Sequence, residues 1–245
     1  MRFESDKCDS ACIEENVFKF TTRISFELSN ICIYSNFHTK CPLHLKPEPN
    51  ILPKAIFLKV LQELKEFKFK GIIGFHNYSE PGIDPRLMSF IELTKGYLPD
   101  CHIYFSTNGF YLTQVIVDEF AEAGVDEIHI SAYSDTEYRR LSKLQSKRIL
   151  LKVDSIELDN RLNIYDHSPK NCTNPCYAPL NEIIINNNTD VVLCCLDWKY
   201  KYKFGNLKKM SLQQILMSGE VRKIYRDLSN GRRLLDICKR CDWTR

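Results

Sequence analysis

The sequence predicts an α/β fold in which a partial (β/α) barrel is followed by a small Cys-rich α+β module. Two observations lead to this prediction: strand-like runs alternate with helix-like stripes over residues 22–154, and cysteines recur beyond residue 172. Repeated strand–helix alternation is typical of a parallel sheet with right-handed crossovers. Five expected strands are too few for a closed eight-stranded barrel. We therefore expect a core domain over residues 22–154 and a second domain over residues 172–243.

The elements of the core domain follow from the spacing of its apolar residues. The expected strands are residues 24–28, 71–75, 102–105, 127–131 and 148–153. The expected helices are residues 54–67, a helix that starts at Asp84-Pro85 and continues through 87–93, residues 112–123 and a segment opening at 134. Asp84 and Ser134 have the residue types of helix N-caps, and Gly124 that of a left-handed helix stop. Ligands of such sheets bind at the carboxyl ends of the strands, because the loops that converge on a substrate lie there.

The remainder of the chain begins with a polar connection over residues 155–175. The elements expected after it are a hairpin of residues 181–185 and 191–195, a strand at 199–204 and a helical region at 211–228. Lysines alternate with aromatic residues over 199–204, which would also suit a platform for single-stranded nucleic acid. Alternation of period two favours a half-buried strand instead.

Composition excludes several function classes. The chain has 245 residues, and 34 Lys and Arg nearly balance 31 Asp and Glu, so a polyanion partner such as nucleic acid is not indicated. No apolar run approaches the length of a membrane span, and the polar start does not resemble a secretory signal. These features predict a cytoplasmic protein without a membrane partner. Eleven cysteines in such a chain indicate metal binding, with burial as small hydrophobes as the plain alternative.

Two cysteines and a histidine follow the first expected strand. Cys32 ends the segment that follows that strand, and eight residues separate it from Cys41. Cys41 and His44 have a Cys-x-x-His spacing. Soft and borderline ligands from one loop can surround one metal centre. Three ligands on a four-iron cluster would leave one iron open to a substrate. An alternative ligand set uses His38 with Cys41.

These residues resemble the signature of the radical S-adenosylmethionine (SAM) superfamily, which is C-x3-C-x2-C in the loop after the first strand. In this chain the first gap has eight residues, and His44 occupies the third cysteine position. Histidine can ligate an iron–sulfur centre. The resemblance therefore implies a [4Fe–4S] cluster on Cys32, Cys41 and His44, and a site that no longer binds a cluster stays open as the alternative.

Motifs after three later strands support the same resemblance. Ser79-Glu80-Pro81 stands where the superfamily has G-E-P, residues 106–109 match S-T-N-G, and residues 123–131 resemble A-G-v-d-x-i-x-i-S. The resemblance implies that five residues bind SAM: Ser79, Glu80, Ser106, Asn108 and Ser131. In the superfamily the carboxylate of the G-E-P motif holds the methionyl amino group, and a carboxylate in a partly desolvated cleft pairs well with an ammonium.

Four cysteines of the second domain have the spacing of another iron–sulfur site. Cys176 and Cys194 are separated by seventeen residues, and Cys194 and Cys238 by forty-three. Two residues then separate Cys238 from Cys241. Four thiolates also suit Zn²⁺, which stays open. The stretches 204–207 and 211–215 resemble SPASM and twitch modules, which bind auxiliary iron–sulfur clusters, and a single four-cysteine set fits the shorter twitch form. The cysteines without an expected role are Cys8, Cys12, Cys101, Cys172 and Cys195.

The resemblance implies an enzyme with two [4Fe–4S] clusters that forms a 5′-deoxyadenosyl radical and abstracts hydrogen from a small molecule. Cysteine spacing and length are similar to those of twitch-type dehydrogenases, which favours oxidation of a sugar or cyclitol alcohol. An external electron donor such as flavodoxin or ferredoxin is implied. Three alternatives stay open: peptide maturation, radical epimerisation with Cys101 or Cys195 returning a hydrogen atom, and a non-catalytic, metal-stabilised binding protein.

Overall fold

One eight-stranded sheet runs through both expected domains. The computed structural model describes residues 21–36, 41–45, 48–155 and 173–241, and the strand order is β5-β4-β3-β2-β1-β6-β7-β8. The strands are β1 (Arg23–Phe26), β2 (Ile72–Phe75), β3 (His102–Thr107), β4 (Glu127–Ala132), β5 (Leu150–Ser155), β6 (Glu182–Ile185), β7 (Asp190–Val192) and β8 (Lys203–Asn206).

The first six strands in this order are parallel, and the last two are antiparallel. Every neighbouring pair from β5 to β6 is parallel, and β6–β7 and β7–β8 are antiparallel. Strand β6 lies beside β1, with Ile24 opposite Ile183. The second domain therefore extends the sheet of the first instead of forming one of its own. Strand β7 ends at Val192, earlier than expected, which leaves Cys194 in the loop after it.

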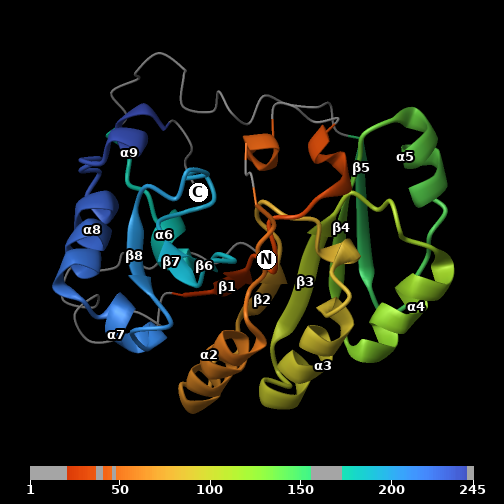
Figure 1. Cartoon of the computed structure of the whole chain (residues 1–245), viewed down its shortest axis with the longest axis horizontal. Helices are drawn as coiled ribbons and strands as arrows, with labels where there is room; N and C mark the ends of the chain where they lie inside the picture. Colours follow the sequence, from red (N-terminus) through yellow and green to blue (C-terminus); the bar gives the residue numbers. More distant parts are fainter. Residues whose placement is uncertain (1–20, 37–40, 46–47, 156–172, 242–245) are drawn as a thin grey trace.

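Helices connect the parallel strands and close the far end of the sheet. They are α2 (Lys54–Glu66), α3 (Leu87–Tyr97), α4 (Gln114–Ala123), α5 (Asp135–Leu141), α6 (Ala178–Asn181), α7 (Leu212–Leu216), α8 (Gly219–Ser229) and α9 (Asp236–Arg240), with 3₁₀ turns η2 (Ile33–Asn36), η3 (Pro42–Leu45) and η4 (Pro81–Ile83). Figure 1 shows α7, α8 and α9 gathered at one end of the molecule and α4 and α5 at the other. No helix in the described part of the chain has the length and apolar character needed to cross a membrane.

The core lies between the sheet and its helices. Helix α2 buries Phe57, Val60, Leu61 and Leu64, as its apolar stripe predicts. The Phe57 ring stacks on Phe90 of α3 with centroids 4.4 Å apart. Each fully buried side chain of this size contributes roughly 1.5–3 kcal/mol. This packing fixes the positions of the parallel strands, and therefore also the positions at which the loops after their carboxyl ends begin.

Local signals were correct at some helix ends and wrong at others. Gly124 ends α4 with φ of 99°, and Ser134 caps α5 by accepting from Glu137 N at 3.2 Å. Asp84 is not the N-cap of α3, a position that Arg86 occupies; Asp84 instead ends η4, and its Oδ2 lies 2.6 Å from Nη2 of Arg86. The expected helical region over 211–228 is two helices, since Ser218 starts α8 by accepting from Val221 N.

The strand expected at residues 199–204 is also wrong in its bounds. Strand β8 begins only at Lys203, and Tyr200 has a left-handed backbone with φ of 50°. The Tyr200 hydroxyl donates to Glu27 Oε1 at 2.6 Å, which draws the side chain into the interior. A buried tertiary hydrogen bond therefore overrides the local alternation at this point.

Candidate functional site

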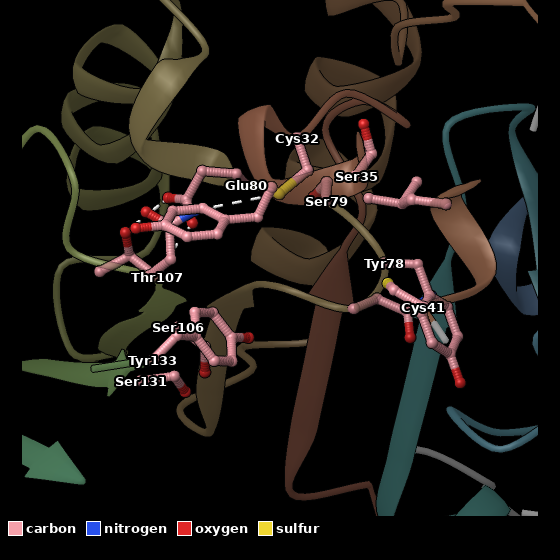
Figure 2. Close-up of a pocket in the computed structure, with 14 residues that line it drawn as sticks. Cys32, Ser35, Cys41, Tyr78, Ser79, Glu80, Ser106, Thr107, Ser131 and Tyr133 are labelled. Carbon is pink, nitrogen blue, oxygen red and sulfur yellow. Dashed lines mark hydrogen bonds between the residues drawn. The ribbon is translucent and has the colours of Figure 1, made fainter. Parts of the chain in front are cut away.

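A cavity of about 600 Å³ that is open to solvent lies at the carboxyl ends of the parallel strands. Figure 2 shows its lining residues, which come from four segments at or after the ends of β1, β2, β3 and β4. Among them are two predicted metal ligands and all five predicted SAM-binding residues: Cys32, Cys41, Ser79, Glu80, Ser106, Asn108 and Ser131. Chain segments about 100 residues apart thus meet at one edge of the sheet, as the parallel topology requires.

The two cysteines of this cavity are the described part of the first metal site. Burial, together with the nearby Glu80 and Cys41, raises the pKa of the Cys32 thiol to about 11. Asn108 Nδ2 lies 3.9 Å from Cys32 Sγ. His44 belongs to η3, one turn after Cys41, but its side chain lies outside the described residues, as does His38. The described residues therefore contribute two thiols, both predicted cluster ligands, to the lining of the cavity.

Glu80 braces two of the loops that form the cavity. Its carboxylate is 3% exposed. Oε1 accepts from Gly82 N at 2.9 Å and Thr107 Oγ1 at 2.5 Å, and Oε2 accepts from Asn108 N at 2.7 Å. Burial raises the pKa of Glu80, although the three donors favour its ionised form. A carboxylate has about four acceptor positions, so Oε2 can also receive an ammonium group of a ligand.

Hydroxyl and aromatic groups complete the wall. Ser79 Oγ is buried without a hydrogen-bond partner among the described residues, which is the state expected of a group that meets a polar ligand. Tyr34 and Tyr133 also line the cavity, with ring centroids 5.3 Å apart. The motifs did not single out these two tyrosines, and their aromatic faces can stack a purine base. The sequence signal that could have identified them is their position two residues after Cys32 and Ser131, respectively.

A second cavity holds all four cysteines predicted for the second site. It encloses about 470 Å³ and is lined by Cys176, Cys194, Cys238 and Cys241 together with apolar side chains and Arg233. Backbone hydrogen bonds fix two of the cysteines, from Cys176 N to Leu228 O at 2.9 Å and from Cys241 N to Cys238 O at 3.3 Å. The four thiols therefore line one cavity although they come from three places: Cys176 precedes α6, Cys194 follows β7, and Cys238 and Cys241 lie in and just after α9.

The chemistry of this second cavity suits an anionic inorganic group. Burial, together with the nearby Cys176 and Cys241, raises the pKa of the Cys238 thiol to about 12. Arg233 is 6% exposed, donates through Nε to Asn174 O at 3.0 Å, and has no partner for Nη2 among the described residues. A guanidinium facing four thiolates would stabilise their charge once a metal replaces the protons.

The four cysteines of this cavity are the ligand set of a [4Fe–4S] cluster, in which each iron takes one cysteine. Four thiolates also suit a tetrahedral Zn²⁺, so the residue types by themselves fit either group.

A third cavity lies between the other two. Thr22, Arg23 and Glu182 line one part of it, and Cys194 and Cys195 line another. The loop after β2 bridges to the second domain here, because Tyr78 Oη donates to Cys195 O at 2.5 Å. The other expected spare cysteine, Cys101, is distant from this region; its Sγ lies 3.4 Å from Phe69 O at the start of β3. Cys8, Cys12 and Cys172 lie outside the described residues.

Comparison with known proteins supports this arrangement. Residues 176–242 match the family model of the SPASM domain, described as an iron–sulfur cluster-binding domain. Over 234 residues the chain is 23% identical to the S-adenosyl-L-methionine-dependent 2-deoxy-scyllo-inosamine dehydrogenase of Niallia circulans, an alignment covering 91% of this chain and 94% of that protein.

Solved structures show the same fold. The structure of BtrN in complex with AdoMet and 2-DOIA matches with a TM-score of 0.77 and 24% identity, over 91% of this chain and 93% of that one. The chain has the fold of the radical SAM enzymes. Native anSMEcpe with bound AdoMet matches with a TM-score of 0.60 and 9% identity, over 84% of this chain and 83% of that one. The predicted partial barrel with a C-terminal SPASM-type module is therefore confirmed.

Proposed function

We propose that this chain is a radical SAM dehydrogenase that oxidises a secondary alcohol of a cyclitol or sugar to a ketone. The observation that carries the proposal is the joint lining of one cavity by Cys32, Cys41 and the five residues of the SAM-type motifs. Its relative from Niallia circulans is named as a dehydrogenase of 2-deoxy-scyllo-inosamine, an aminocyclitol, and matches nearly the whole chain.

The residues of the first cavity fit a cluster and SAM. We assign Cys32, Cys41 and His44 as cluster ligands, Glu80 as the acceptor for the methionyl ammonium, and Ser79, Ser106, Asn108 and Ser131 as polar contacts to SAM. When both are bound, the cluster and SAM supply a 5′-deoxyadenosyl radical, which removes a hydrogen atom from an unactivated carbon. The protein's part is to orient SAM against the substrate and to exclude water from the cavity.

The residues of the second cavity fit an auxiliary cluster. We assign Cys176, Cys194, Cys238 and Cys241 as its ligands, with the Arg233 guanidinium balancing their charge. Oxidation of an alcohol to a ketone releases one electron after hydrogen abstraction, and a second redox centre can accept that electron. Hydrogen abstraction alone needs no such acceptor. An external one-electron donor such as flavodoxin or ferredoxin belongs to the same proposal, as does a location in the cytoplasm.

One alternative reaction has an observation in its favour. Cys195 lines the cavity between the two cluster sites, so its thiol is placed to return a hydrogen atom to a substrate radical. Such a step would give an epimer instead of a ketone. Cys101 cannot take this role, because its side chain is buried at the amino end of β3.

The test is anaerobic turnover of the iron-loaded chain with SAM, dithionite and 2-deoxy-scyllo-inosamine. We expect 5′-deoxyadenosine and a ketone in comparable amounts, and neither from Cys41→Ala. An epimer carrying solvent deuterium would support the Cys195 alternative. SAM that stays intact in the fully loaded wild-type chain would contradict the proposed function.

A further inference from the structure

Three side chains form a closed hydrogen-bonded group between the two cluster sites. His76 Nε2 lies 2.7 Å from Ser25 Oγ and 3.0 Å from Glu182 Oε1, and Ser25 Oγ donates to Glu182 Oε1 at 2.6 Å. His76 immediately precedes Asn77, which lines the first cavity. Glu182 lines the middle cavity, together with Cys194 and Cys195. The group therefore connects a residue beside the first cavity to a residue that lines the middle cavity.

The hydrogen bonds define which ring nitrogen carries the proton. Because Ser25 donates its hydroxyl hydrogen to Glu182, its oxygen can only accept from the imidazole. Nε2 therefore bears the hydrogen, which it shares between Ser25 Oγ and Glu182 Oε1. Nδ1 has no hydrogen bond to any residue in the described ranges, and the side chain of His76 is 17% exposed. In the neutral ring, the lone pair of Nδ1 is therefore available to a ligand.

The surroundings preserve this arrangement. The Tyr104 ring packs beside the imidazole with centroids 5.2 Å apart. A Cβ at Gly74 would lie 2.5 Å from Tyr104 Cε1 and 3.1 Å from His76 Cδ2, so only glycine leaves room for both rings. Burial opposes the charge on Glu182, but the hydrogen bond and the charge of His76, a hydrogen bond from Ser25 and the nearby Arg23 lower its pKa to about 2. An ionised carboxylate hydrogen-bonded to an imidazole is the arrangement that stabilises an imidazolium.

We infer that Nδ1 of His76 accepts the hydroxyl proton of the alcohol that the chain oxidises, with Glu182 and Ser25 as positioning residues. The inference rests on the proposed function. In the balanced reaction, the carbon-bound hydrogen atom goes to the 5′-deoxyadenosyl radical and the hydroxyl proton goes to His76. One electron leaves for the auxiliary iron–sulfur cluster as the C=O bond forms. Loss of the proton leaves negative charge on oxygen, which makes loss of the electron easier.

The first experiment separates hydrogen abstraction from proton removal. In His76→Gln the side-chain amide can still donate to Glu182, but it has no basic nitrogen. We expect ketone formation to fall at least about 100-fold, as for the loss of a general base, while 5′-deoxyadenosine continues to form. The ratio of 5′-deoxyadenosine to ketone therefore rises, which a merely structural role of His76 would not produce.

The matched control is His129→Gln on strand β4, which β3 separates from β2. His129 is also a carboxylate-paired imidazole, with Nε2 2.7 Å from Glu127 Oε1, and it packs on the other side of Tyr104. We expect it to keep the wild-type product ratio. Glu182→Gln, which leaves the base but weakens its support, should lower ketone formation about tenfold. A wild-type ratio in His76→Gln contradicts this inference alone, whereas a wild-type chain that forms no 5′-deoxyadenosine contradicts the proposed function.

A second experiment needs neither turnover nor a variant. Diethyl pyrocarbonate acylates accessible neutral imidazoles, and peptide mass spectrometry locates the modified histidines. In the iron-loaded wild-type chain we expect 2-deoxy-scyllo-inosamine to protect His76 at least fivefold and to leave His129 equally modified. Equal modification of His76 with and without the cyclitol would overturn the inference.

Discussion

The two predicted cluster sites differ in how the chain encloses them. The first cavity is lined by four segments at the carboxyl ends of the parallel strands, and its lining contains hydroxyls, two amides and a carboxylate beside two cysteines. The four-cysteine cavity is lined mainly by cysteines and apolar side chains, and it adjoins a buried cluster of Leu193, Leu228 and Cys238. One site is built to admit a polar ligand and the other to shield a group from solvent.

This difference in lining shows how one sheet can support two kinds of metal chemistry. A centre with three protein ligands and polar surroundings can bind a cosubstrate at its remaining position. A centre with four cysteine ligands in apolar surroundings can only exchange electrons. The middle cavity shares Cys194 with the four-cysteine cavity, and Glu182 of the His76–Glu182 pair also lines it. The predictions below test this contrast.

The largest effect is expected from Cys238→Ser. It removes one ligand of the enclosed site and places a hydroxyl in an apolar cluster. We expect iron to fall from about eight to about four per chain. Because metal binding contributes to folding there, we expect the free energy of unfolding to fall by about 3 kcal/mol or more. Iron and sulfide assays with thermal unfolding measure both. Cys101→Ala is the control, since this buried cysteine lies outside both cavities and its loss should leave the iron unchanged.

An intermediate effect is expected from His44→Ala. If His44 is the third ligand of the open site, iron again falls to about four per chain, and SAM cleavage falls at least about 100-fold. The unfolding free energy should change by less than about 1 kcal/mol, because this site lies on loops at the sheet edge. His38→Ala is the matched control and should keep the wild-type iron and SAM cleavage. The reverse outcome for the two histidines would assign the ligand to His38.

The smallest effect is expected from acid at the boundary between the sites. The folded-state pKa of Glu182 is about 2, below its ordinary value of 4.5, and its side chain is 15% exposed. Its stabilising contribution is therefore complete well above pH 4.5 and is lost as the pH falls towards 2. Between pH 6 and pH 3.5 we expect a loss of about 1 kcal/mol from this group. Urea unfolding should show that loss in the wild-type chain and not in Glu182→Gln; equal acid sensitivity of both chains would contradict it.

The sequence predicted the part of the site that depends on local motifs. Cys32, Cys41 and the motif residues around Glu80 and Asn108 each follow a strand, and parallel topology then requires them to meet. The structure brings all of the described ones to one cavity. The four cysteines of the second site were predictable in the same way, since the Cys-x-x-Cys turn and the strand-end cysteine carry their own signals. The roles of these residues stay predictions until iron and SAM binding are measured.

Other features had no local signal. His76 and Glu182 are 106 positions apart, and they form a pair only because β6 lies beside β1 in the sheet. Tyr34 and Tyr133 come together through the fold of two loops. The left-handed turn at Tyr200 depends on a buried bond to Glu27. Each is a contact between segments remote in sequence, which no periodicity within either segment can specify.

The sequence by itself determined the α/β class, the order of the strands along the chain and the two sets of metal-binding residue types. Apolar periodicity and ligand spacing are properties of neighbouring residues, so they can be recognised without the fold. Tertiary structure alone decided that the second domain continues the first sheet and that a carboxylate-supported imidazole lies between the two cysteine sites. Those outcomes depend on which strand edge remains free to pair and on which side chains then share a face, and both are fixed only when the whole sheet forms.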